Sequence, residues 1–455
     1  MHASRGSRVS DRSACILAGM ARTPVDPRRN LWPLVGGQSI SLFGDYLAFF
    51  FALPIFVRDQ TGSATQLGLL GLFETVAVLG FGFLAGVLLD RVRLRRALIL
   101  ADIARMLALG LLALAVTLDV GETWMAFAVA FIVGSMGTVF DSGLESYIPS
   151  VLNDELLVRA NTMLSMGRNL AQTLGFVAGG AVIIATGGVA GAFALDALSY
   201  GVSIIGILLL REARPRRPAE KEAIWTSLRL GISTLWNIGP VRWATAAAAL
   251  ANLAFAPLAA VMTLYAEQEL GILSESNLGL FFAGFSLIGV VGVSLAPGIV
   301  ARVGLGRSVV VGGLVFGVGA IGAGLADGAW AVIPFGIAMG GVSLNQVAFV
   351  TLRQRLTPPH LLGRVIAASR TIAWGGIPVG LMIGTPIGDA VGLRPLFVGS
   401  GILIAVIAVL LVTGPLWRVA PTTPSAAGPD DDLDAPDGHR TGTGPWGRLP
   451  DRRGP

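Results

Sequence analysis

The sequence predicts an all-α membrane protein with twelve transmembrane helices in two pseudo-symmetric halves of six. Three observations support this fold class. The chain is 53% hydrophobic and 13% charged, with a mean hydropathy of +0.72, whereas a soluble domain carries about 25% charged residues. Apolar runs of roughly 20 residues, enough to cross a bilayer as a helix, recur along the chain. Arginines gather in alternate loops, as expected of short loops on the cytoplasmic side.

An Arg- and Ser-rich leader, residues 1–30, is expected to be disordered and cytoplasmic. The predicted spans then cover residues 31–57, 64–89, 97–118, 123–147, 159–186, 189–210, 241–266, 277–301, 307–326, 330–352, 365–388 and 394–415. The N-terminal half is predicted at 31–210 and the C-terminal half at 240–417. Residues 418–455 are rich in Pro, Gly and Asp and are expected to form a disordered cytoplasmic tail.

The distribution of charge over the loops predicts the orientation. Loops expected outside carry Arg58 and Arg394 as their only cations, and the remaining loop arginines fall inside. We therefore expect a multi-pass protein of the inner (cytoplasmic) membrane with both termini in the cytoplasm. Its partners would be membrane lipid and a small-molecule substrate, and we expect a monomer.

The longest internal connection, residues 211–239, is predicted to be a cytoplasmic linker. Within it, apolar residues recur at helical spacing: Ile224, Leu228, Ile232, Leu235 and Trp236. This pattern indicates an amphipathic helix lying on the inner membrane surface.

The composition argues against several classes of protein. The sole lysine, Lys221, is not preceded by a phosphate-binding Gly-rich loop, so the chain is not an ATP-driven pump. The histidines lie outside the spans and Cys15 is the single cysteine, so we expect neither a metal site nor enzymatic chemistry. Basic charge on one membrane face requires no nucleic-acid partner, and no cofactor is implied.

A charged turn between the second and third spans carries the most specific motif. It reads Gly86-Val-Leu-Leu-Asp90-Arg91-Val-Arg93-Leu-Arg95-Arg96. This resembles the G-x-x-x-D-[RK]-x-G-[RK]-[RK]-[RK] motif of the major facilitator superfamily, with Arg93 where the family usually has glycine and Leu94 where it usually has a cation. A weaker copy near 298–304 and the paired segments 152–159 and 356–364 indicate two repeated halves, as in alternating-access transporters.

Gly44-Asp45 and the segment 153–161 are similar to the branch of that family that contains macrolide-efflux proteins and the enterobactin exporter. The family's antiporter motif in span five appears as Gly175-Phe176-Val-Ala-Gly179-Gly180, without its proline. The resemblance implies a secondary transporter, an antiporter that exports a hydrophobic or amphipathic drug or siderophore by alternating access, driven by protons. An uptake carrier for a small metabolite and a non-transporting sensor of the same fold remain alternatives.

Charged residues inside the spans are the candidate functional groups, because each is costly at a helix centre unless it meets a partner or a cavity. Asp45 and Glu74 are expected near mid-depth in adjacent spans, where loss of water favours the protonated carboxyl. They are our candidates for proton coupling, although either could simply bond a neighbouring helix. Asp102 and Arg105 are three residues apart on span three and are expected to form an ion pair.

A cytoplasmic gate is predicted where the charged turn meets the inner ends of spans four and five. The acids Asp141 and Glu145 are one helical turn apart and repel each other, so they require a cation. The predicted gate residues are Gly86, Asp90, Arg91, Arg95, Arg96, Asp141, Glu145 and Arg168. A static ion-pair network is the alternative interpretation.

Candidate residues for a substrate cavity come from both halves. Aromatic side chains crowd spans one and two, and amides lie in spans seven and ten. The set is Phe49, Phe73, Asn252, Asn345 and Gln346. Aromatic walls suit an apolar or amphipathic solute, while helix packing and interhelical hydrogen bonding are the ordinary alternatives.

The predicted topology can be tested by accessibility. A peptide tag at the extreme C-terminus should be shielded from an antibody added to intact cells and should become reachable once the membrane is permeabilised. Recognition of the tag on intact cells would contradict the orientation, and with it the assignment of inner and outer loops.

Overall fold

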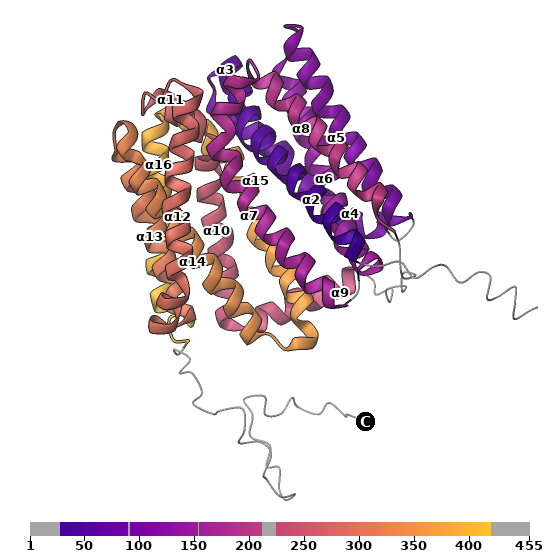
Figure 1. Cartoon of the computed structure of the whole chain (residues 1–455). Coiled ribbons are helices and arrows are strands. Elements are labelled where there is room, and N and C mark those ends of the chain that lie inside the picture. Colours follow the sequence, from indigo (N-terminus) through magenta and orange to yellow (C-terminus); the bar gives the residue numbers. More distant parts are fainter. Residues whose placement is uncertain (1–27, 90–91, 153, 212–223, 420–455) are drawn as a thin grey trace, which may run out of the picture.

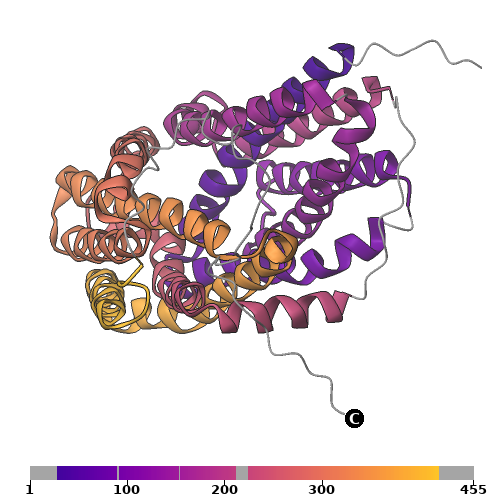
Figure 2. The same ribbon diagram turned by 90° about the horizontal axis from the view of Figure 1, so that it is seen from below.

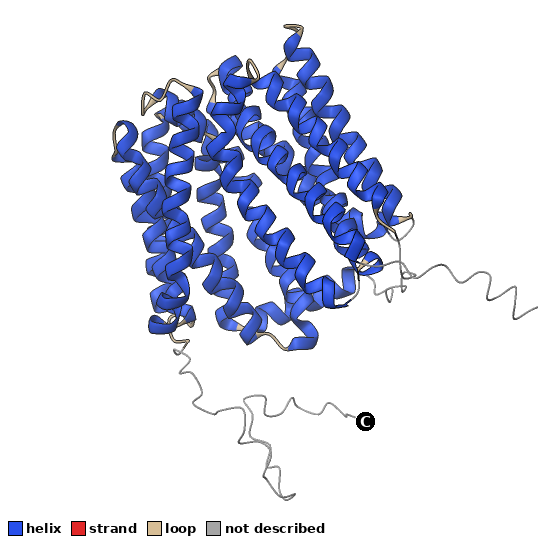
Figure 3. Ribbon diagram, viewed as in Figure 1, coloured by secondary structure: helices blue, strands red, loops and turns tan. Residues whose placement is uncertain are grey.

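The computed structural model describes residues 28–89, 92–152, 154–211 and 224–419. Every regular element in these ranges is helical, as Figure 3 shows. A helix satisfies its backbone hydrogen bonds within one segment, which is what a chain inside hydrocarbon requires. The all-α fold class predicted from the sequence is confirmed.

The N-terminal half begins with one long helical run that contains a π-helical segment. Its elements are α2 (Arg28–Leu47), η1 (Ala48–Ala52), α3 (Leu53–Thr61), α4 (Ala64–Leu89), α5 (Leu94–Thr117), α6 (Thr123–Val151), α7 (Asp154–Ala185) and α8 (Val189–Leu209). The first run extends beyond its predicted end at residue 57 and stops at Gly62, which adopts the left-handed conformation that commonly terminates helices.

The C-terminal half follows the linker helix α9 (Ile224–Asn237). Its elements are α10 (Gly239–Ala260), α11 (Met262–Gln268), α12 (Glu275–Val303), α13 (Leu305–Leu325), η2 (Gly328–Ala331), α14 (Val332–Leu356), η3 (Pro359–Leu361), α15 (Leu362–Val391), α16 (Leu393–Leu410) and η4 (Leu411–Thr413). The span predicted at 241–266 is divided at Val261, whose backbone (φ −93°, ψ 7°) departs from the helical conformation.

Eleven of the described helical segments are long and apolar enough to cross a membrane. The remaining long helix of the two halves, α7, is not among them. It carries several polar residues, including Arg159, Asn161 and Arg168. The protein is therefore a multi-pass membrane protein, and the twelfth crossing, by α7, stays a prediction from the sequence.

The two halves meet along two pairs of helices. Helix α4 packs against α15, and α7 packs against α12. Figure 1 shows the halves as two groups of helices that approach each other at the end that carries α3 and α11. We call this the closed end, and we call the opposite end, near α9, the linker end.

Glycines let α7 approach its neighbours closely on two sides. A Cβ at Gly175 or Gly179 would press against Tyr46 and Phe51 of the first helical run. A Cβ at Gly180 would overlap the backbone carbonyl of Glu275, which begins α12 in the other half. The glycines of the predicted span-five motif thus lie at a close helix-helix contact, the use of small residues that is typical of membrane helices.

Helix α9 lies across the linker end of the bundle rather than along it, as Figures 1 and 2 show. It packs against α15, where Gly231 approaches the carbonyl of Arg364 and Leu235 is buried against Val365 and Ala368. Trp236 on the same helix is exposed, and the guanidinium of Arg242 lies 5.9 Å from its ring. This is the arrangement expected of an interfacial helix.

The contact at Gly180 gives a test of how the halves meet. Gly180→Ala should loosen the closed end, because the added methyl group cannot fit against the Glu275 carbonyl. A cysteine placed at Leu278, in a background with Cys15→Ser, should then react faster with an impermeant maleimide. Gly298→Ala, on α12 where a Cβ meets open space, is the matched control. Equal labelling of both variants would contradict the contact.

Candidate functional site: a buried polar cluster and a closed end

Asp102 and Arg105 form an ion pair inside the N-terminal half. Both side chains lie on α5, and Asp102 is fully buried while Arg105 is 5% exposed. The guanidinium donates to Asp102 Oδ1, and the other carboxylate oxygen accepts a 2.7 Å hydrogen bond from Ser203 Oγ of α8. The structure therefore brings together the pair that the i,i+3 spacing predicts, with a partner helix that the spacing does not identify.

Two aromatic rings enclose the guanidinium of Arg105. Its central carbon lies 4.6 Å from the ring centroid of Phe140 on α6 and 4.4 Å from that of Tyr200 on α8. The negative faces of these rings attract the cation, and the attraction strengthens when water is removed. Side chains from three helices, α5, α6 and α8, thus hold the Arg105 guanidinium in place.

Tyr200 also connects Arg105 to Asp45 of α2. The phenolic hydroxyl donates a hydrogen bond to Asp45 Oδ1, while its ring faces Arg105. Asp45 is half-buried and lies just before the π-helical segment η1. Gln38, further back on α2, donates a 2.9 Å bond to Ser203 and so joins the same network.

Asp196 of α8 is a further buried acid, and the sequence analysis did not select it. Its side chain is fully buried, it accepts a 2.9 Å hydrogen bond from Ser199, and it lies against Gly44, the residue before Asp45. The signal was present, because an aspartate interrupts the apolar run of span six. We call Asp45, Asp102, Arg105, Asp196 and Tyr200 the N-half polar cluster.

Glu74 does not join this cluster. It lies half-buried on α4, and its backbone contacts Gly134 of α6. Within the part of the chain that the structure describes, its carboxylate has no hydrogen bond or ion pair. The two candidate proton-coupling acids therefore differ: Asp45 belongs to a network, and Glu74 stands apart from it.

The predicted cytoplasmic gate is only partly described. Asp90 and Arg91 lie outside the described residues, and Gly86 belongs to the last turns of α4. Arg95 donates to the carbonyl of Leu208 on α8. The other members, Arg96, Asp141, Glu145 and Arg168, are exposed and form no ion pair with one another among the described residues. The gate stays a prediction.

The candidate cavity residues are mostly engaged in packing. The amide of Asn252 donates to the carbonyl of Ala373 at 2.8 Å, from α10 to α15. That of Asn345 donates to the carbonyl of Val309 at 2.9 Å, from α14 to α13. Phe73 stacks on Phe127 of α6 with ring centroids 5.5 Å apart. In addition, Phe49 is buried and Gln346 is exposed.

Ionic contacts join the two halves at the closed end. Arg58 of α3 is 7% exposed, and its guanidinium lies 3.1 Å from Glu267 and 3.3 Å from Glu275 of the other half. Asp389 of α15 accepts hydrogen bonds from the backbone N–H groups of Ala64 (2.7 Å) and Thr65 (2.9 Å). A carboxylate from one half thus caps the positive N-terminus of α4 in the other.

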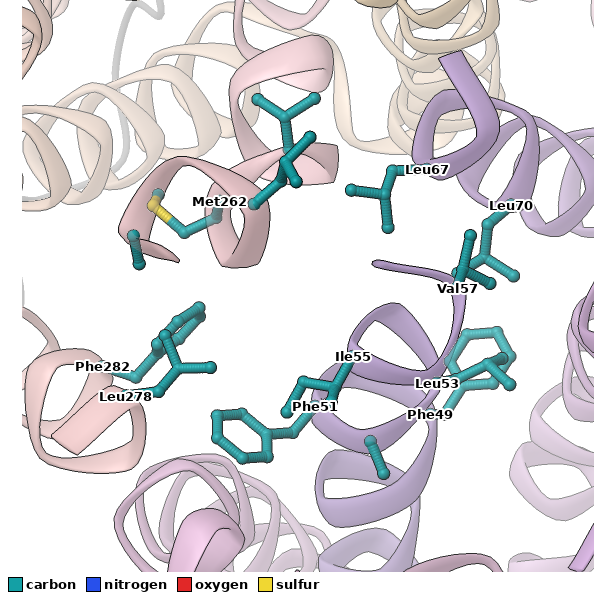
Figure 4. Close-up of a cluster of buried hydrophobic side chains, with 14 of the residues drawn as sticks. Phe49, Phe51, Leu53, Ile55, Val57, Leu67, Leu70, Met262, Leu278 and Phe282 are labelled. Atoms are coloured by element: carbon teal, nitrogen blue, oxygen red, sulfur yellow. The ribbon is translucent and has the colours of Figure 1, made fainter. Parts of the chain in front are cut away.

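A hydrophobic cluster shared by both halves lies beneath these ionic contacts. Figure 4 shows Phe51 and Phe282 facing each other, and their ring centroids are 5.7 Å apart. The residues labelled there are Phe49, Phe51, Leu53, Ile55, Val57, Leu67, Leu70, Met262, Leu278 and Phe282. Each of the other hydrophobic clusters of the described residues involves one half alone, and one cluster of the C-terminal half also includes Leu235 of the linker helix α9. The conformation is therefore held shut at the α3–α11 end.

These features are those of a helical membrane transporter: two packed groups of helices, charged side chains buried inside one of them, and contacts between the groups concentrated at one end. Comparison with known proteins identifies its family. The model of the Major Facilitator Superfamily matches residues 34–381. The chain belongs to this superfamily.

Two curated relatives are similar over most of the chain. The multidrug efflux pump Tap of Mycolicibacterium fortuitum is 24% identical over 392 residues, which cover 79% of this chain and 90% of that protein. The enterobactin exporter EntS of Salmonella typhimurium is 25% identical over 393 residues, which cover 82% and 90%. The resemblance to this superfamily and to its efflux proteins, predicted from the sequence motifs, is confirmed.

Solved structures show the same fold at low identity. The nucleoside transporter NupG superposes with a TM-score of 0.68 at 11% identity, over 85% of this chain and 99% of that one. A bacterial homologue of the human lysosomal transporter Spinster gives 0.67 at 16% identity, over 86% and 97%.

Removing the cation should destabilise the N-half polar cluster. Arg105→Met leaves Asp102 buried without its partner, so the free energy of unfolding should fall by about 3–5 kcal/mol. Adding Asp102→Asn to that variant should recover part of the loss, because residue 102 then no longer carries a buried charge without its partner. Thermal unfolding of the purified protein in detergent measures both. Arg96→Met, an exposed arginine on the same helix, is the control. A change no larger than the control's would contradict the assignment.

Proposed function

We propose that this protein is a proton-driven exporter of a hydrophobic or amphipathic small molecule, either a drug or a siderophore. The observation that carries the proposal is its similarity, over about four fifths of its length, to a multidrug efflux pump and an enterobactin exporter. The protein would reside in the cell membrane with both termini in the cytoplasm, since its arginine-rich loops are expected on that side.

The contacts between the halves support an alternating-access cycle. With the closed end outside, the conformation described here admits substrate from the cytoplasm or the inner leaflet. Export then requires the halves to rock apart at the closed end. That step separates Arg58 from Glu267 and Glu275, withdraws Asp389 from the N-terminus of α4, and parts Phe51 from Phe282. The linker end must close in exchange, with the charged turn as the predicted gate.

The N-half polar cluster supports proton coupling. An acid inside a span is costly and marks proton relays in many transporters. Asp45 is half-buried and bonded to Tyr200, so one carboxylate of the network combines partial access with a hydrogen-bond donor. Protons would enter from the outer side when the closed end opens and leave on the inner side, so that their downhill flow drives the substrate out.

Substitution of the two candidate acids tests this function. Asp45→Asn should abolish the acceleration of ethidium efflux, or of enterobactin export, by an imposed proton gradient, because an amide cannot exchange a proton. Glu74→Gln should weaken it if that acid contributes separately. Glu122→Gln, an exposed acid in a loop, is the matched control. Transport is followed in cells and inverted vesicles. Unchanged gradient-driven transport in both Asp45→Asn and Glu74→Gln would refute the proton-site hypothesis.

A further inference from the structure

The charges of the N-half polar cluster do not balance. Three carboxyl groups, Asp45, Asp102 and Asp196, lie around one guanidinium, that of Arg105. Arg105 forms an ion pair with Asp102, and the second oxygen of that carboxylate accepts a hydrogen bond from Ser203. Among the residues that the structure describes, no cation is bonded to the two remaining acids, so two negative charges would be left inside the membrane if both were ionised.

Asp45 and Asp196 differ in how well each can carry a charge. Asp45 is half-buried, receives a hydrogen bond from the Tyr200 hydroxyl and lies in the field of Arg105. Asp196 is fully buried, and its Oδ1 receives one bond from the neutral Ser199, while its Oδ2 has no hydrogen-bond partner within the described ranges of the chain. An unpaired carboxylate oxygen with no access to water is among the costliest groups to bury. A proton bound to Asp196 removes that cost.

Asp196 lies next to Asp45 in space. A Cβ at Gly44 would meet Asp196 Oδ1, so the carboxyl group rests on the backbone of α2 immediately before Asp45. The two acids are close enough to repel each other when both are charged. Ionisation of one therefore favours protonation of the other, as in other carboxyl pairs.

We propose that Asp196 and Asp45 form one proton-binding pair and that Asp196 holds the transported proton in the conformation closed at the α3–α11 end. This proposal rests on proton-driven export and names the residue that carries the proton. The proton comes from water, forms an O–H bond with a carboxylate oxygen of Asp196, and returns to water by way of Asp45 when that bond breaks. The electron pair stays on oxygen, so no other reactant is needed.

Several charged or titratable groups surround the pair and would influence its titration. They are Asp102 and Arg105 of α5, Asp141 of α6, Tyr200 of α8, and, through Tyr46 of α2, Arg168 of α7. Asp45 and Phe51 belong to the same helical run, and Phe51 packs against Phe282 of the other half. Protonation or ionisation of Asp45 therefore changes the charge on the same helical run that supplies Phe51 to the closed end.

Asp196→Asn tests whether the proton bound to Asp196 is exchanged during transport or stays bound permanently. Asparagine has nearly the same shape as a neutral aspartic acid and keeps an oxygen for Ser199, so the variant should fold. The full-length protein in maltoside detergent is titrated, and the protonated-carboxyl band is followed in infrared pH-difference spectra. We expect Asp196→Asn to lose one titrating band, whereas Glu122→Gln should match the unsubstituted protein.

Transport by the same variants gives the second readout. In inverted vesicles, Asp196→Asn should lose the acceleration of ethidium transport by a proton gradient, while exchange of ethidium without a gradient persists. If Asp196→Asn keeps every titrating band and full gradient-driven transport, Asp196 is a permanently neutral structural residue and the proposal is wrong. Loss of gradient coupling only in Asp45→Asn would overturn the pair and leave the proposed function standing. If the unsubstituted protein ignores the gradient, the proposed function itself fails.

Ser199→Ala provides an independent variant that keeps both carboxyl groups. It removes the one side-chain hydrogen bond that Asp196 accepts from the described residues, so the pH midpoint of the infrared band should move. An unchanged midpoint would contradict the assignment of that band to Asp196.

Discussion

A single guanidinium organises the interior of the N-terminal half. Arg105 is ion-paired with Asp102 on its own helix, enclosed by Phe140 from α6 and Tyr200 from α8, and linked through Tyr200 to Asp45 on α2. Hydrocarbon offers a charge no solvent, so each of these contacts replaces hydration that the bilayer cannot provide. Four helices are fixed by this requirement, and the positions of the candidate coupling acids follow from it.

The contacts between the halves have a different character. At the closed end they are ionic at the surface and aromatic beneath, and a glycine allows α7 to approach α12. Arg58 is buried, but its partners Glu267 and Glu275 are partly exposed, so hydration of the two acids offsets part of the cost when these pairs break. These contacts hold the halves together at the closed end without preventing the separation that the proposed cycle requires. The polar cluster within the N-terminal half, by contrast, is costly to separate because its charges have no water to replace their partners, so in the proposed cycle it would keep its shape while the halves move.

Much of the fold follows from hydropathy and loop charge, because both report directly on the bilayer. The pairing of Asp102 with Arg105 was also predictable, since it depends only on helical spacing. The hydrogen bond from Tyr200 to Asp45 was not predictable, because it depends on which helices are neighbours, and α2 meets α8 only in the folded bundle.

Other parts of the candidate site were not predicted from the sequence. Asp196 was not selected although it interrupts an apolar run. Asn252 and Asn345, expected near substrate, instead donate to backbone carbonyls of adjacent helices. The role of the charged turn stays a prediction because Asp90 and Arg91 lie outside the described residues.

The cap that Asp389 places on α4 has a consequence for the opposite conformation. The first amide groups of α4 find their acceptor in the other half of the molecule, through Ala64 and Thr65. In the proposed cycle, separation of the halves at this end would remove that acceptor, and the amino end of α4 would carry an uncompensated partial positive charge. In the proposed outward-open conformation, that end of α4 would therefore favour an anion from the surrounding solution.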